Sequence, residues 1–93
     1  MKAGCRILIS GRVQGVFFRE NAVATAKRLG IKGWVRNRED GTVEIVAEGA
    51  KARMRQFIEW CNKGPPEAKV DNVDVKDHAP TGEFSGFEMV GKN

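Results

Sequence analysis

Two stretches of this chain carry apolar residues on one side of a helix only, and this feature limits the possible folds most. The first stripe has helical spacing and consists of Ala22, Val23, Ala26 and Leu29. The second lies within residues 50–63 and consists of Met54, Phe57, Ile58 and Cys61. A helix with one apolar face must bury that face against another layer. Two such helices predict a second layer that both of them cover.

Segments with the alternation or β-branched content of strands surround the two stripes. They are residues 5–10, 31–37, 42–48, 69–75 and 84–90. Asp40-Gly41 predicts a hairpin turn between the second and third strands, and Gly30 is expected to end the first helix in a left-handed conformation. The order β-α-β-β-α-β with a short final strand predicts an α+β fold, the ferredoxin-like two-layer sandwich. Its sheet should be mainly antiparallel, with both helices on one face. Residues 1–93 contain no linker or repeat and are expected to form a single domain.

The charge pattern argues against a large anionic partner. The 16 Lys and Arg residues exceed the 12 Asp and Glu residues by four, but they are scattered along the chain. The first and third strands also lack the aromatic residues with which RNA-recognition domains stack bases. We therefore expect no nucleic-acid partner. The chain has no secretory signal and no run of about 20 apolar residues, so we expect a cytoplasmic protein that does not enter membranes.

The residues that most often serve as metal ligands, nucleophiles or acid–base groups are expected to have ordinary structural positions in this chain. Cys5 and Cys61 lack the close spacing of metal or redox sites and are expected to be buried thiols, a disulfide being the less favoured alternative. The single histidine, His78, is expected to be solvated in a polar loop. Solvated positions in a turn or on the outer face of the third strand are also expected for Glu39, Asp40, Glu44 and Glu48. The sequence therefore predicts no metal cluster and no carboxylate pair for acid–base catalysis.

The stretch most indicative of a binding site is residues 11–19, with the sequence GRVQGVFFR. It joins an apolar strand to a helix, and its glycines let the backbone approach a ligand closely. The first turn of the helix leaves backbone N–H groups unpaired, and Arg19 adds a planar group of donors suited to phosphate oxygens. The spacing matches neither of the two common nucleotide-binding glycine loops. The stretch predicts a phosphate site, with an ordinary surface turn as the alternative.

Three segments together resemble the signature of a known enzyme family. They are residues 11–19 (GRVQGVFFR), 33–37 (GWVRN) and 40–44 (DGTVE). In these sequences and their separation the chain is similar to the acylphosphatases, which have the ferredoxin-like fold. The similarity extends from the first strand to the closing segment of residues 84–87. Glu20, directly after Arg19, is the most visible departure from the family pattern and is expected to temper the local positive charge.

The resemblance implies a function and a set of site residues. It implies hydrolysis of an acyl phosphate, a small-molecule substrate, to a carboxylate and inorganic phosphate, which would also act as an inhibitor. Arg19 and Asn37 are the implied catalytic residues, with Asn37 orienting the attacking water. The implied phosphate-binding groups are the guanidinium of Arg19 and the backbone N–H groups of Gly15, Val16, Phe17, Phe18 and Arg19. Thr42 is expected to support the loop. No metal or other cofactor is implied, and a monomer is expected because each helix uses its apolar face on the sheet.

Two other classes of function remain open at this point. One is a non-catalytic phosphate-binding or regulatory module of the same fold, similar to the acylphosphatase-like domain that begins the large hydrogenase-maturation carbamoyltransferases. The other is a nucleic-acid-binding module built on the same sheet. Arg12, Arg36 and Arg38 flank the signature segments and either raise the positive potential of the site or are simply solvated. Hydrolysis of benzoyl phosphate distinguishes the enzyme from both modules.

Overall fold

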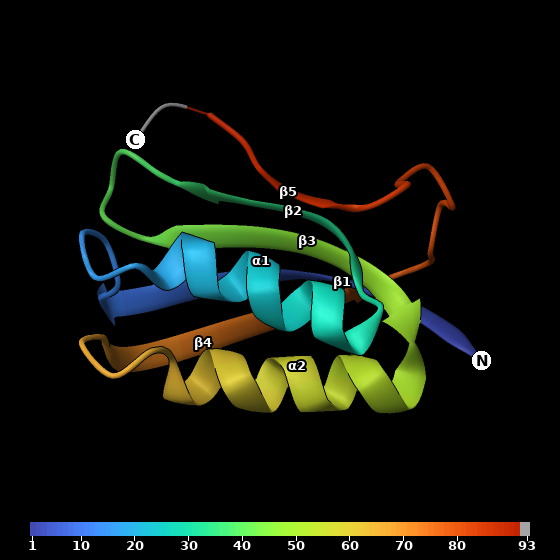
Figure 1. Cartoon of the computed structure of the whole chain (residues 1–93), viewed down its shortest axis with the longest axis horizontal. Helices are drawn as coiled ribbons and strands as arrows, with labels where there is room; N and C mark the ends of the chain where they lie inside the picture. Colours follow the sequence, from blue (N-terminus) through green and yellow to red (C-terminus); the bar gives the residue numbers. More distant parts are fainter. Residues whose placement is uncertain (92–93) are drawn as a thin grey trace.

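The computed structural model describes residues 1–91 and shows a sheet covered on one face by two helices (Figure 1). The elements in chain order are β1 (Lys2–Arg12), α1 (Phe18–Leu29), β2 (Lys32–Asn37), β3 (Val43–Ala50), α2 (Lys51–Lys63), β4 (Lys69–His78) and β5 (Phe87–Met89). The strand order in the sheet is β4-β1-β3-β2-β5. The pairs β1–β3, β1–β4 and β2–β3 are antiparallel, and β2–β5 is parallel. The predicted fold class is confirmed.

The core lies between the sheet and the helices, where both predicted stripes are buried or half-buried. Ile7 and Ile9 of β1 and Phe57 of α2 belong to this core, and all three side chains are fully buried. Phe18, the first residue of α1, is 1% exposed, and its ring centroid lies 5.1 Å from that of Trp60 on α2. Because α1 is anchored in the core at its first residue, the loop that precedes it has a fixed endpoint.

Gly33 allows β2 to lie close against β3. Its φ of 142° is in the region that favours glycine, and a Cβ atom at this position would lie 1.9 Å from the carbonyl oxygen of Val46. The Gly33 N–H donates to the carbonyl oxygen of Gly86 at 2.9 Å, which draws the last segment alongside β2. Any side chain at residue 33 would force β2 away from its neighbour. The predicted left-handed conformation of Gly30 is confirmed, with φ of 71°.

The strand boundaries differ from the predicted ones, most of all in β1, β4 and β5. β1 covers Lys2–Arg12, and β4 continues to His78, so this histidine ends a strand and does not lie in a loop. Its side chain is exposed, as expected. β5 contains only Phe87–Met89, because just three β2 residues, 33–35, pair with it. Local alternation indicated each strand, but its length depends on the partner strand.

The expectation that Glu44 and Glu48 are solvated is wrong. They are only 4% and 6% exposed, although they lie on the sheet face opposite the helices. The Glu48 carboxylate accepts hydrogen bonds from the N–H groups of Thr81 and Gly82 at 2.8 and 3.0 Å and from the Thr81 hydroxyl at 2.9 Å. Burial by itself raises the pKa of Glu48, but these hydrogen bonds outweigh it and lower the pKa below its usual value. Thr81 and Gly82 thus cover Glu48 on a face that the sequence pattern predicts to be open.

Both cysteines are buried free thiols, as expected, and the alternative disulfide is not formed. The Cys5 Sγ lies 3.6 Å from the sulfur of Met54, and burial together with the charge of Asp77 raises the pKa of Cys5 to about 11. Burial likewise raises the pKa of Cys61. Neither thiol is therefore a reactive thiolate at neutral pH. Among the described residues, no helix has the length and apolar character needed to span a bilayer.

Candidate active site

The loop between β1 and α1 presents backbone N–H groups at the start of a helix. Gly15 and Phe17 have positive φ values of 76° and 62°, so the chain turns sharply before Phe18. Phe17 is the N-cap residue of α1, and no side chain in residues 1–91 caps this end of the helix by a hydrogen bond. The first-turn N–H groups therefore remain available to an external acceptor. An anion is the acceptor that the helix dipole favours at this end.

Asn21 fixes the orientation of the last peptide group of the loop. The carbonyl oxygen of Phe17 accepts from the backbone N–H of Asn21 at 3.2 Å and from its side-chain Nδ2 at 2.8 Å. The N–H of Phe18 lies in the same peptide plane as this carbonyl. Two hydrogen bonds on the carbonyl thus also set the direction of the Phe18 N–H before any ligand binds.

A pocket of about 140 Å³ brings the loop together with the end of β2. Its lining residues are Val13, Gly15, Phe17, Phe18, Arg19, Glu20 and Asn37. Arg19 and Asn37, the two implied catalytic residues, are 18 positions apart in the chain, yet they line this one pocket, and both are half-buried. A second hollow of about 450 Å³ adjoins it at Asn37 and extends over the turn of residues 38–40.

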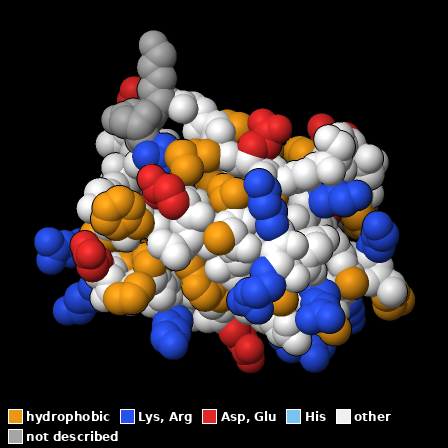
Figure 2. Space-filling model, viewed as in Figure 1, with side chains coloured by type: hydrophobic (Ala, Val, Ile, Leu, Met, Phe, Trp, Pro, Cys, Tyr) orange, Lys and Arg blue, Asp and Glu red, His pale blue; other side chains and the backbone are white. Residues whose placement is uncertain are grey.

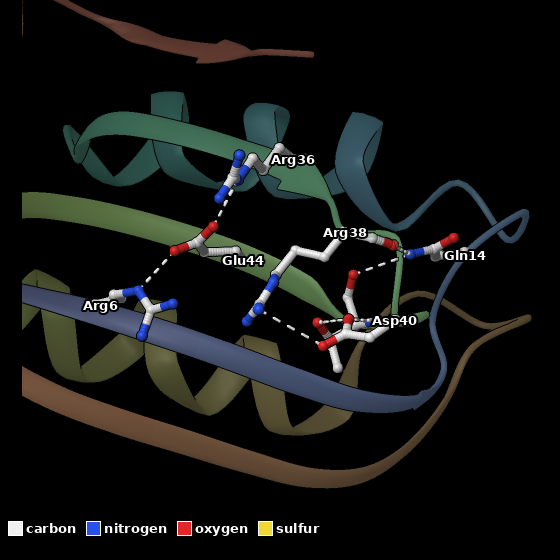
Figure 3. A network of polar contacts seen from close by, with 7 residues as sticks. Arg6, Gln14, Arg36, Arg38, Asp40 and Glu44 are labelled. Atoms are coloured by element: carbon white, nitrogen blue, oxygen red, sulfur yellow. Dashed lines mark hydrogen bonds and ion pairs between the residues drawn. The ribbon is translucent and has the colours of Figure 1, made fainter. Parts of the chain in front are cut away.

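Gln14 ties the loop to the turn that follows β2 (Figure 3). Its side-chain Nε2 donates to the carbonyl oxygens of Arg38 at 2.8 Å and Thr42 at 2.9 Å. Thr42, expected to support the loop, contacts it through this carbonyl. Sequence reasoning assigned no role to Gln14. The available signal was a neutral amide, with two donors on one nitrogen, inside an otherwise glycine-rich and apolar loop.

The turn itself is held by Asp40. Its carboxylate accepts from the Thr42 hydroxyl at 2.6 Å and from the Thr42 N–H at 3.0 Å. The side-chain hydrogen bond, followed by the backbone one, lowers the pKa of Asp40 below its usual value. Asn37, the last residue of β2, pairs with Val43 of β3 on the other side of this turn. The turn therefore limits how far the end of β2 can move relative to the loop.

Glu44 neutralises one of the flanking arginines. Its carboxylate accepts from the Nε of Arg6 and the Nε of Arg36, each at 2.6 Å, as Figure 3 shows. Burial raises the pKa of Glu44, but the two guanidinium groups outweigh this and lower it. Arg38 forms a looser ion pair with Asp40, in which the Arg38 Nη2 lies 3.7 Å from the Asp40 Oδ2. These ion pairs reduce the positive potential that Arg36 and Arg38 contribute. Arg19 is the arginine that lines the smaller pocket.

We expect replacement of Gln14 to loosen the site. Gln14→Ala removes two hydrogen bonds and should lower the free energy of unfolding by about 1–3 kcal/mol, since each bond contributes about 0.5–1.5 kcal/mol. Affinity for inorganic phosphate should fall as well, because the loop loses its link to residues 38–42. Urea denaturation and isothermal titration measure the two effects. Gln56→Ala, at an exposed position on α2, is the matched control. Unchanged phosphate affinity in Gln14→Ala would show that the loop keeps its shape without this link.

The chain forms a two-layer α+β sandwich whose first strand–helix loop carries N–H groups beside an arginine and an amide, an arrangement suited to an anion. A family model described as Acylphosphatase matches residues 5–89. The chain is 50% identical over 84 residues to the acylphosphatase of Anaeromyxobacter dehalogenans, which covers 90% of each chain. The crystal structure of acylphosphatase from Bacillus subtilis superposes with a TM-score of 0.92 at 37% identity, covering 98% of this chain and all of that one. The chain belongs to the acylphosphatase family, and it is an enzyme that hydrolyses acyl phosphates.

The comparisons also bear on the regulatory-module alternative. A crystal structure of full-length HypF superposes with a TM-score of 0.85 at 28% identity, but the chain covers only 12% of HypF. The Bacillus subtilis and Anaeromyxobacter dehalogenans proteins, in contrast, match it over nearly their whole lengths. The similarity is therefore greater to acylphosphatases of this size. Within residues 1–91, no group of three or more His, Cys, Asp or Glu side chains is arranged to hold a metal ion.

Proposed function

We propose that the phosphoryl group of the acyl phosphate binds in the 140 Å³ pocket. The backbone N–H groups of residues 15–19 surround it, and the guanidinium of Arg19 holds two of its oxygens. The observation that carries this proposal is that Arg19 and Asn37 line one pocket at the uncapped start of α1. The N–H groups and the helix dipole stabilise the negative charge that the phosphoryl oxygens carry throughout the transfer.

Asn37 orients the attacking water from the side of β2. The water oxygen forms a bond to phosphorus while the bond from phosphorus to the acyl oxygen breaks. The electron pair of the broken bond leaves with the carboxylate, and the proton of the water passes to a phosphate oxygen of the substrate. A carboxylate is a good leaving group, so positioning and charge stabilisation supply most of the acceleration. Hydrolysis by this mechanism needs no metal ion.

The metal-free mechanism predicts two results in one assay. Hydrolysis of benzoyl phosphate should continue at its full rate in excess chelator, because the phosphoryl charge is stabilised by N–H groups and Arg19. Inorganic phosphate should inhibit competitively, because it occupies the same pocket as the substrate. Initial rates measured across both concentrations decide this. A loss of activity in chelator that a divalent metal restores would contradict the proposed mechanism.

We also propose that the enzyme acts as a cytoplasmic monomer. The two buried free thiols are consistent with a reducing compartment. Both helices bury their apolar stripes against the sheet of the same chain, which leaves those faces unavailable to a second copy. Sedimentation at micromolar and higher concentrations checks the oligomeric state.

A further inference from the structure

Phe17 exposes its ring at the proposed phosphate loop. The side chains before and after it, Val16 and Phe18, are buried in the core, whereas Phe17 is 60% exposed. Burial of the Phe17 ring therefore contributes little to the stability of the fold. Single exposed apolar residues are common and need no explanation by themselves. The backbone of Phe17 is what sets this one apart.

Phe17 is held in a conformation that suits other residues better. Its φ of 62° and ψ of 26° are left-handed, and it is the one non-glycine among residues 1–91 with positive φ. Glycine or asparagine adopts this conformation with less strain than a bulky residue does. The two hydrogen bonds from Asn21 to the Phe17 carbonyl keep it in place. Neither packing nor backbone preference accounts for a phenylalanine here, and strained bulky residues of this kind occur mainly at functional sites.

The position of Phe17 suggests what the ring does. Phe17 lines the 140 Å³ pocket from the loop, whereas Asn37 lines it from the end of β2. Figure 2 shows apolar side chains at the surface at several places in the view, among them its left end, where the loop before α1 lies. A group that emerges from the pocket on the loop side therefore meets apolar surface as well as solvent.

We propose that the ring of Phe17 contacts the acyl part of the substrate and gives the enzyme a preference for acyl phosphates with an aromatic or bulky apolar acyl group. This inference rests on the proposed position of the phosphoryl group. In an in-line displacement, the leaving carboxylate lies on the side of phosphorus opposite the water. With the water at Asn37 on the sheet side, the acyl group points toward the loop and Phe17.

The size of the preference follows from the apolar area that such a contact removes from water. An aromatic acyl group against the Phe17 ring gains both area burial and the favourable geometry of an aromatic pair. An acetyl group is too small to cover the ring. Differences of this kind in apolar contact typically change kcat/KM by about tenfold or more.

The experiment compares wild type, Phe17→Leu and Phe17→Ala with benzoyl phosphate and acetyl phosphate. Leucine and alanine both keep a Cβ atom, so the left-handed backbone is disfavoured in all three proteins and only the apolar surface changes. We expect the ratio of kcat/KM for benzoyl phosphate to that for acetyl phosphate to fall about tenfold in Phe17→Ala. Phe17→Leu should lie between the other two. Val75→Ala, which removes an exposed apolar side chain on β4, should leave the ratio unchanged.

Two other outcomes are distinguishable. Equal losses for both substrates in the Phe17 variants, or no change in either, would show that the ring does not contact the acyl group and would overturn the inference. Competitive inhibition by inorganic phosphate, which has no acyl group, should change less than the rate with benzoyl phosphate. Failure of wild type to hydrolyse either substrate would instead contradict the proposed function, since the ratio would then not exist.

Discussion

Arg19→Lys should lower kcat/KM for benzoyl phosphate by about 100- to 1,000-fold, the usual loss when a preorganised contact to a transition-state charge is removed. Lysine keeps the positive charge but not the planar group with parallel donors, so it cannot contact two phosphoryl oxygens in the same geometry. Affinity for inorganic phosphate should fall too. Steady-state kinetics and isothermal titration measure the two losses.

Arg28→Lys is the matched control for this variant. Arg28 is exposed in the last turn of the same helix. Arg28→Lys therefore makes the same chemical change as Arg19→Lys, but at a position that does not line the pocket. Circular dichroism should show that both variants are folded. Kinetics of Arg19→Lys close to those of wild type would mean that another cation, such as Arg38 in the adjoining hollow, holds the phosphoryl group.

Asn37→Ala should separate binding from chemistry. The N–H groups of residues 15–19 and the guanidinium of Arg19 remain in place, so inorganic phosphate should bind with an affinity within a few-fold of wild type. Turnover should fall by about 100-fold or more, because an alanine cannot hold the water in line with the bond to be broken. The measurement is kcat for benzoyl phosphate beside phosphate affinity determined by titration.

The outcome for Asn37→Ala has two informative failures. Equal losses of turnover and phosphate affinity would assign Asn37 to the phosphate site itself and not to the water. Normal turnover would remove Asn37 from the mechanism. Asn72→Ala, at an exposed position on β4, controls for the general effect of replacing an asparagine in this sheet.

The element order and the fold class could be predicted from the sequence because both rest on local periodicity. Alternation of period two and stripes of period 3.6 mark which residues face the core, and Ile7, Phe57 and Cys61 are buried as those patterns require. Strand lengths could not be predicted as well, since β5 pairs with only three residues of β2. Pairing between strands depends on tertiary structure, and the local sequence pattern carries little information about which residues will pair.

The polar framework of the site was missed for the same reason. The local pattern predicts Glu44 to be a solvated outer-face residue, because it contains no sign of Arg6, which is 38 positions earlier and donates a hydrogen bond to the Glu44 carboxylate. Glu48 is covered by Thr81, which is 33 positions later in the chain. Gln14 shows no role until the turn at Arg38 comes within 2.8 Å. The loop pattern itself indicated Arg19 as a phosphate-binding residue, whereas Asn37 was assigned only by the family resemblance. The structure brings the two into one pocket.

The Gln14 link has a consequence for how the enzyme matures after synthesis. Its two hydrogen bonds join residues 24 and 28 positions apart, so the loop and the turn meet only after β1, β2 and β3 have assembled. A partly folded chain that has formed α1 alone possesses the helix N-terminus but not the finished pocket. Contacts of such long range form late and slowly compared with local helices. Hydrolytic activity is therefore a reporter of completed assembly, and any phosphate compound that occupies the pocket shifts the folding equilibrium toward the native chain.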